Sequence, residues 1–172
     1  MKIFRLVLLT VFISLTLSCS SDDDSAPSNG NIAGVWKGTA VNYYGSTSTT
    51  MQGQTINADF IGEAYDLNYT LTFSENPNTV TSEGSYSIEL KTTYLGQTTT
   101  QNIENLSFLS DGVWTRNGDR LSVTVDNETD EVTIIELSAT KLVLEGVQNE
   151  TVEQGGATVT STSHVSMSFS RQ

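Results

Sequence analysis

Apolar and polar side chains alternate one by one along most of the chain, which is the period of a β-strand with one buried face. In DLNYTLTF, residues 66–73, every second side chain is apolar and the intervening ones are mostly Asn and Thr. The same spacing recurs in SYSIEL (85–90), RLSVTV (120–125) and HVSMSF (164–169). No segment of helical length carries a 3.6-residue period. The pattern predicts an all-β chain.

Turn signals separate these runs at short intervals, as in an antiparallel meander. Asn117-Gly118 predicts a two-residue hairpin turn with positive φ at both positions. Other signals lie at residues 76–78, 95–96, 126–130, 138–140 and 155–156. NIENLSFL, residues 102–109, fits either a bulged strand or one helical turn. We predict eight to ten strands that close into an up-and-down β-barrel, with a two-sheet β-sandwich as the alternative.

The N-terminal residues have the pattern of a secretory signal peptide. Lys2 and Arg5 precede an apolar run over residues 6–17, which is shorter than the roughly 20 residues of a membrane-spanning helix. Ser18 supplies a small side chain directly before Cys19, the single cysteine of the chain. We therefore predict a signal peptide over residues 1–18.

The residues around Cys19 resemble the lipobox of bacterial lipoproteins. TLSC, residues 16–19, departs from the commonest form at Thr16, where that family has leucine. The resemblance implies cleavage before Cys19 and attachment of acyl chains to it, so that the partner of this residue is a lipid bilayer. A free or buried cysteine is the alternative.

The following SSDDD, residues 20–24, resembles the surface-export signal of Bacteroidota lipoproteins. It implies an outer-membrane lipoprotein facing the cell surface, with a periplasmic-facing anchor as the alternative. Residues 19–31 are polar and acidic, which predicts a disordered tether before a single domain over residues 32–172.

The charge balance excludes one class of partner. Loss of Lys2 and Arg5 with the signal peptide leaves six basic residues against 20 acidic ones, a net charge of −14. Nucleic-acid binding depends on basic residues that neutralise phosphates, so we expect no nucleic-acid partner. High like charge also favours a monomer.

Longer segments resemble the lipocalin-like domain of Bacteroidota lipoproteins: GVWKG (34–38), GVWTRNGDRLSVTV (112–125) and IIELSATKLVLEG (134–146). The resemblance implies a lipocalin-like β-barrel in which Gly34 lets the chain bend, Trp36 plugs one barrel end and Arg171 packs over that tryptophan. The Thr-Asp-Tyr signature, the disulfide and the C-terminal helix of lipocalins proper are missing from this sequence.

Motifs for catalysis or metal binding are weak. His164, the single histidine, lacks a nucleophile-elbow motif and alternates with Val165 as an outward-facing strand residue. Asp126, Glu128 and Asp130 are spaced like calcium ligands, but Glu131 and Leu137 stand where an EF-hand needs Gly and Glu. We therefore predict a non-catalytic protein without a metal or cofactor, and keep a His164-dependent hydrolase as the least favoured reading.

Aromatic strand residues indicate where a ligand would bind. An eight-stranded barrel either fills its interior with side chains or holds one small ligand. We expect capture of a small, partly apolar molecule in the barrel mouth, with the candidate lining residues Tyr69, Phe73, Tyr86, Trp114 and Phe169. The alternative is a surface adhesion or accessory module that binds a glycan or a protein through loops and the tyrosines Tyr44, Tyr65 and Tyr94.

Overall fold

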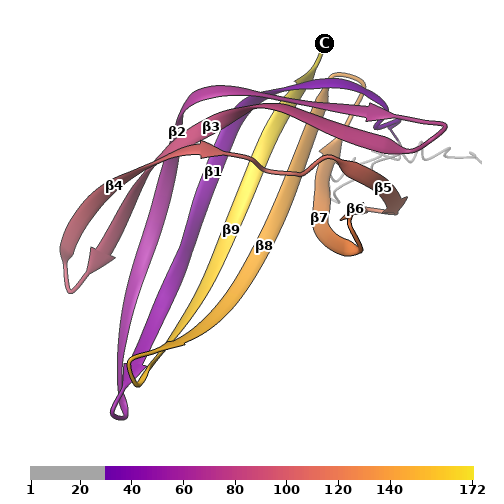
Figure 1. The fold of residues 1–172 in the computed structure, drawn as a ribbon. Helices are drawn as coiled ribbons and strands as arrows, with labels where there is room; N and C mark the ends of the chain where they lie inside the picture. Colours follow the sequence, from indigo (N-terminus) through magenta and orange to yellow (C-terminus); the bar gives the residue numbers. More distant parts are fainter. Residues whose placement is uncertain (1–29) are drawn as a thin grey trace, which may run out of the picture.

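The computed structural model describes residues 30–172, and every regular element among them is a β-strand (Figure 1). The predictions for the signal peptide, Cys19 and most of the tether concern residues outside this range. The nine strands are β1 (Gly34–Met51), β2 (Gln54–Ser74), β3 (Thr79–Tyr94), β4 (Gln97–Leu106), β5 (Gly112–Asn117), β6 (Arg120–Val125), β7 (Glu128–Leu137), β8 (Lys141–Gln154) and β9 (Ala157–Arg171).

All nine strands belong to one antiparallel sheet that closes on itself as a ring. The order is β2-β1-β9-β8-β7-β6-β5-β3-β4, and β2 also pairs with β3. The ring closes where β3 meets β5, through only two residue pairs, Thr79 with Val113 and Val80 with Gly112. Strand β4 pairs with the C-terminal half of β3 and lies outside this closure. The prediction of an antiparallel meander is confirmed, and the single sheet excludes the sandwich.

The strands differ greatly in length, so the ring is not a uniform barrel. Strands β1 and β2 have 18 and 21 residues, whereas β5 and β6 have six each. The β1–β2 and β8–β9 hairpins extend well beyond the short strands (Figure 1). One end is therefore enclosed by all the ring strands, and the other continues as an open, curved sheet with a concave face.

The core lies inside the enclosed end and follows the predicted alternation. Tyr69, Leu71 and Phe73 of β2 are at most 2 % exposed. They pack with inward side chains of the other strands, among them Leu121, Val123, Leu142, Leu144, Met167 and Phe169. Burying one large apolar side chain contributes about 1.5–3 kcal/mol, so this cluster is the main source of stability.

Tight two-residue turns connect most neighbouring strands. Both turn residues have positive φ in Gln52-Gly53, Leu95-Gly96, Asp126-Asn127 and Gly155-Gly156, the conformation of a type I′ hairpin. The prediction for Asn117-Gly118 was wrong in register. Asn117 pairs with Arg120 in the ladder, so the turn is Gly118-Asp119, and only Gly118 of the predicted pair has positive φ.

The ambiguous segment over residues 102–109 combines the end of a strand with the start of a loop. Strand β4 ends at Leu106, and its pairing with β3 shifts register between Tyr86 and Ile88. The chain then turns inward, so that Leu109 is only 2 % exposed although it lies in no strand. The three-residue spacing of apolar positions here reflects this irregularity and not a helix.

Candidate ligand-binding cavity

At the enclosed end, Trp36 is fully buried beneath the guanidinium group of Arg171. The Arg171 Cζ atom lies 4.1 Å from the centre of the indole ring. The indole Nε1 donates a hydrogen bond of 2.7 Å to the carbonyl of Ile32, so its one polar group is satisfied. Because Arg171 is half-buried, its cation over the indole face contributes about 1 kcal/mol.

Arg171 of β9 also forms hydrogen bonds with the segment before β1 and with the turn between β7 and β8. Its Nη1 and Nη2 donate 2.6 Å hydrogen bonds to the carbonyls of Ala33 and Asn31, and its Nε donates one of 2.8 Å to the carbonyl of Ala139. Gly34 has φ +134, and a Cβ there would lie 2.4 Å from Nη1 of Arg171. The absence of a side chain at Gly34 therefore leaves room for the arginine.

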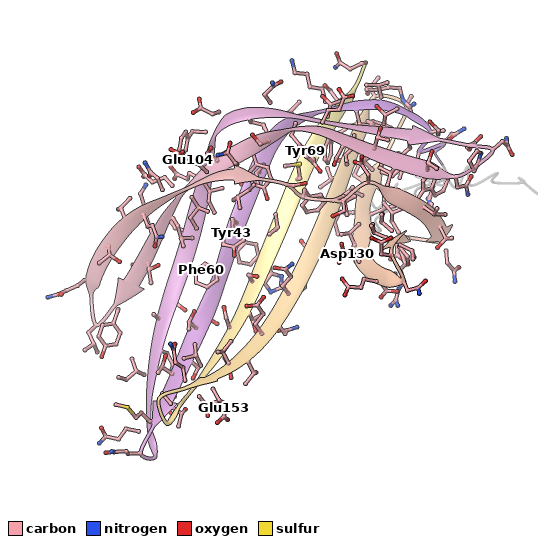
Figure 2. The ribbon with its side chains drawn as sticks, viewed as in Figure 1. Tyr43, Phe60, Tyr69, Glu104, Asp130 and Glu153 are labelled. Carbon is pink, nitrogen blue, oxygen red and sulfur yellow. The ribbon has the colours of Figure 1, made fainter. Side chains whose placement is uncertain are left out.

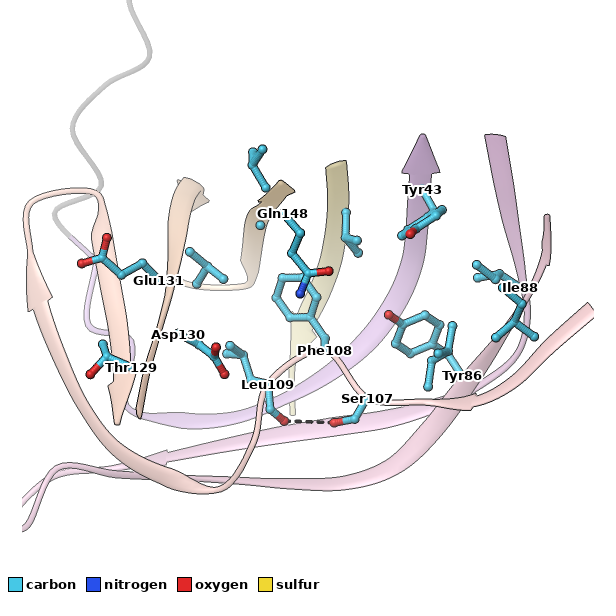
Figure 3. A pocket seen from close by; sticks show the side chains of 16 residues that line it. Tyr43, Tyr86, Ile88, Ser107, Phe108, Leu109, Thr129, Asp130, Glu131 and Gln148 are labelled. Atoms are coloured by element: carbon cyan, nitrogen blue, oxygen red, sulfur yellow. Dashed lines mark hydrogen bonds between the residues drawn. The ribbon is translucent and has the colours of Figure 1, made fainter. Parts of the chain in front are cut away.

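A cavity of about 690 Å³ opens on the concave side, beyond the core (Figure 3). Ligand pockets for small molecules typically measure roughly 300–1,000 Å³. Its walls come from β1, β3, β4, β7, β8, β9 and the loop after β4. The apolar part of its wall is built by Ile88, Ile103, Leu106, Phe108, Leu109, Val132 and Val165, and polar groups make up about half of the lining surface.

The strand pairing explains why space remains here. Strand β7 pairs with β8 only as far as Glu145, and β4 pairs only with β3 among the described strands. The sheet is therefore interrupted between β4 and β7. Beside this interruption, β8 continues past Glu145 without pairing to β7. Gly146 lies in the cavity wall, and the nearest atoms to a Cβ there would be 3.6 Å away, on Val132.

The loop that forms one wall is fixed by a buried tyrosine. The hydroxyl of Tyr69 donates a hydrogen bond of 2.9 Å to the carbonyl of Leu109 and accepts one of 2.9 Å from the Leu109 amide. Ser107 donates a further bond of 3.0 Å to the same carbonyl. Asp111 accepts a 2.7 Å bond from the amide of Ser82, so the loop is also attached to β3. The wall is thus preformed.

Two tyrosines and two carboxylates are among the polar groups of the lining. Burial, followed by the proximity of Tyr69 and Tyr43, raises the pKa of Tyr86 to about 12. Its hydroxyl is therefore neutral at physiological pH. Asp130 and Glu131 of β7 lie at the opposite side of the cavity from Tyr43 and Tyr86 (Figure 3). Gln148 and Thr129 add neutral hydrogen-bonding groups.

An aromatic pair continues the concave surface beyond the cavity. The rings of Tyr43 and Phe60 stack with their centres 5.6 Å apart, and both labels lie on the long strands in Figure 2. Phe60 packs over Gly45, where a Cβ would be 2.4 Å from its ring. The glycine therefore makes the close packing of this pair possible.

The structure separates the five residues that the sequence suggested as pocket lining. Tyr86 lines the cavity. Tyr69, Phe73, Trp114 and Phe169 instead pack in the core of the enclosed end, because the ring strands surround them there. Tyr69 nevertheless positions the cavity wall through Leu109. The candidate lining residues taken from the sequence did not include Tyr43, Phe108 or Gly146, and Asp130 was considered only as a possible calcium ligand.

Residues considered for other chemistry lie elsewhere. His164 is half-buried on the convex face, stacked on Tyr44 with ring centres 4.8 Å apart and an interplanar angle of 2°. Tyr44 and Tyr94 are 45 % and 38 % exposed, and Tyr65 is half-buried. Within residues 30–172, no group of three or more metal-ligating side chains occurs. The described residues also contain no helix long and apolar enough to span a bilayer.

Comparison with known families identifies the fold. The family model of the lipocalin-like domain matches residues 32–144, about two thirds of the chain. The chain therefore belongs to the lipocalin-like domain family, whose members are generally non-catalytic binding proteins for small hydrophobic molecules. No curated protein and no solved structure matches the chain.

Proposed function

We propose that this protein is a non-catalytic binding protein that holds a small, partly apolar molecule in the cavity between β4 and β7. The observation that carries the proposal is a preformed cavity of about 690 Å³ whose lining combines a cluster of apolar side chains with polar groups. This combination is typical of small-molecule sites. The match to the lipocalin-like family supports the same role.

Native mass spectrometry of residues 20–172 tests this proposal, because every strand and the whole core lie within residues 30–172. The protein is expressed in bacteria without Cys19 and is then incubated with a lipid extract. We expect a discrete additional mass that leaves on gentle activation. Gly146→Leu, which places a side chain in the cavity, should remove this mass. An unchanged apo mass for the wild type under all conditions contradicts the proposal.

We further propose that acyl chains on Cys19 anchor the protein in the outer membrane. The support is the lipobox-like TLSC after a positively charged, apolar leader. One acyl chain binds a membrane reversibly, whereas two or three give stable attachment. Incorporation of a labelled fatty acid, abolished by Cys19→Ala, is the expected result. Labelling that survives this substitution contradicts the anchor.

The acidic residues after Cys19 support placement of the protein on the cell surface. Replacement of the three aspartates at 22–24 by asparagine removes the acidic part of the SSDDD segment and preserves its length. We expect the wild-type protein to be digested by protease added to intact cells and the variant to be protected. Equal digestion of both contradicts the role of these residues.

A second candidate function, recognition of a glycan or protein at the convex face, rests on the exposed Tyr44, which stacks on the half-buried His164. A flat aromatic surface of this kind suits the apolar face of a sugar ring. Tyr44→Ala should then abolish binding on a glycan array while Gly146→Leu preserves it. The reverse result assigns binding to the cavity.

A further inference from the structure

The charged groups that line the cavity are both acidic. Asp130 and Glu131 belong to the lining, and no lysine, arginine or histidine among the described residues does. Glu131 already has a partner, because Nη1 of Arg120 lies 3.0 Å from its Oε2. Ser122 also donates a hydrogen bond to Glu131, which holds this carboxylate on the side of β6. Of the two lining carboxylates, Asp130 is thus the one without a cationic partner among the described side chains.

The register of β7 directs Asp130 to the inside of the ring. Asp130 pairs with Val123, a fully buried core residue, and Val132 on the same face of β7 is also buried. Side chains at every second position share one face of a strand, so Asp130 continues the inward face of Val132 into the cavity. Figure 3 shows its carboxylate among the lining side chains, beside Leu109.

Aromatic rings elsewhere in the lining also suit a cation. Phe108 lines the same cavity as Asp130, and Tyr43 and Tyr86 line its opposite side. The face of an aromatic ring attracts a cation within about 6 Å of its centre. Tyr86 is neutral at neutral pH, and burial raises its pKa further, to about 12, so that its ring carries no negative charge. The charged and aromatic groups of the lining therefore favour positive charge, and its apolar side chains favour an apolar body.

We propose that the ligand of this cavity is an amphipathic cation, a molecule with an apolar body and an amine, and that Asp130 is its counter-ion. This inference rests on the proposed binding function and adds the charge of the ligand to it. Anionic amphiphiles such as fatty acids are disfavoured, because they would approach two carboxylates in a chain of net charge −12. The negative charge of Asp130, which no cationic side chain among the described residues neutralises, would repel the carboxylate of a fatty acid.

A matched series of probes tests the charge preference. Decylammonium, decanol and decanoate share one apolar chain and differ in charge at neutral pH. Each compound is titrated as a competitor of the neutral fluorescent probe N-phenylnaphthylamine for binding to residues 20–172. The concentration of each competitor stays below the value at which that competitor forms micelles. We expect decylammonium to bind more tightly than decanol, and decanoate to bind most weakly. The preference should diminish as salt is added, because Asp130 is solvent-exposed.

Two neighbouring substitutions separate a specific counter-ion from the overall charge of the protein. Asp130→Asn should reduce the preference for decylammonium over decanol by about threefold to fivefold, the effect of one exposed ion pair. Glu131→Gln removes the same charge from the next residue and should reduce the preference by less than twofold. Unfolding measurements on both variants establish that they remain folded.

The outcomes distinguish the two proposals. If decanol binds but decylammonium binds no more tightly, or if both substitutions reduce the preference equally, the cationic ligand is excluded and the binding function stands. If neither decanol nor N-phenylnaphthylamine binds the wild-type protein, both proposals are contradicted. The predicted order of affinities, lost selectively in Asp130→Asn, supports both.

Discussion

The guanidinium group of Arg171 lies 4.1 Å from the centre of the Trp36 ring and joins the last strand to the first. It also donates hydrogen bonds to three backbone carbonyls. Arg171→Ala removes the cation over the ring and leaves these carbonyls without their donor. We expect the free energy of unfolding to fall by about 3 kcal/mol, measured by denaturant titration.

The matched control is Arg120→Ala, which removes an exposed arginine paired with Glu131. Exposed ion pairs contribute about 0–1 kcal/mol, so this variant should lose little stability. Equal losses in the two variants would show that Arg171 has no special structural role.

Gly34 is the residue whose backbone makes room for Arg171. Its φ of +134 is strained for any L side chain, and a Cβ would lie 2.4 Å from Nη1 of the arginine. Gly34→Ala should therefore lower the free energy of unfolding by about 2 kcal/mol or more. Gly146→Ala is the control, since its Cβ would make only an ordinary contact at 3.6 Å. A stable Gly34→Ala variant contradicts this account.

Leu95 occupies an unfavourable position at the tip of the β3–β4 hairpin. It is 83 % exposed and has φ 46, a conformation that bulky L residues avoid. Leu95→Asn creates Asn-Gly, the preferred type I′ pair, and should raise the free energy of unfolding by about 1 kcal/mol. Leu95→Ala removes the same exposed apolar side chain without this preference. If Ala stabilises the protein as much as Asn does, turn geometry is not the cause.

Ionisation of Tyr86 makes the free energy of unfolding depend on pH in the alkaline range. Its ordinary pKa is 10, and burial raises the pKa to about 12 in the folded state. Between these values the unfolded chain loses this proton and the folded chain keeps it, so stability falls as pH rises through this window. Below pH 10 both states hold the proton and the contribution is constant. Tyr86→Phe should flatten the decline measured between pH 10 and 12; an identical decline in both proteins contradicts the prediction.

The fold was largely predictable because the signals that specify it are local. Alternation at Tyr69, Leu71 and Phe73 reports one buried face, and pairs such as Gly155-Gly156 mark hairpins. The turn at Asp126-Asn127 was placed only within a broader acidic segment, because turn-favouring Asp and Asn occur at several of residues 126–130 and do not show which pair forms the turn. The register error at Asn117 arose since only the ladder pairing with Arg120 decides which two residues form the turn.

The cavity was much less predictable, because it depends on where strands stop pairing. The lengths of the strands, as judged from the sequence, do not predict that the pairing of β7 with β8 stops at Glu145. They also do not predict that β4 lies outside the closed ring. These features decide that Tyr86 meets the cavity while Tyr69 and Phe169 lie in the core. Asp130 was noted in the sequence only as part of an incomplete calcium motif, and its inward direction follows from pairing with Val123.

The central claim, that the cavity between β4 and β7 binds a small apolar molecule, is tested most directly by fluorescence titration with N-phenylnaphthylamine. We compare wild-type residues 20–172 with Gly146→Leu, which fills the cavity, and with Val143→Leu, which enlarges a half-buried β8 residue outside it. The account predicts saturable binding of one molecule to the wild type and to Val143→Leu, and at least tenfold weaker binding to Gly146→Leu. Absence of binding to the wild type, or equal binding to all three proteins, would contradict it.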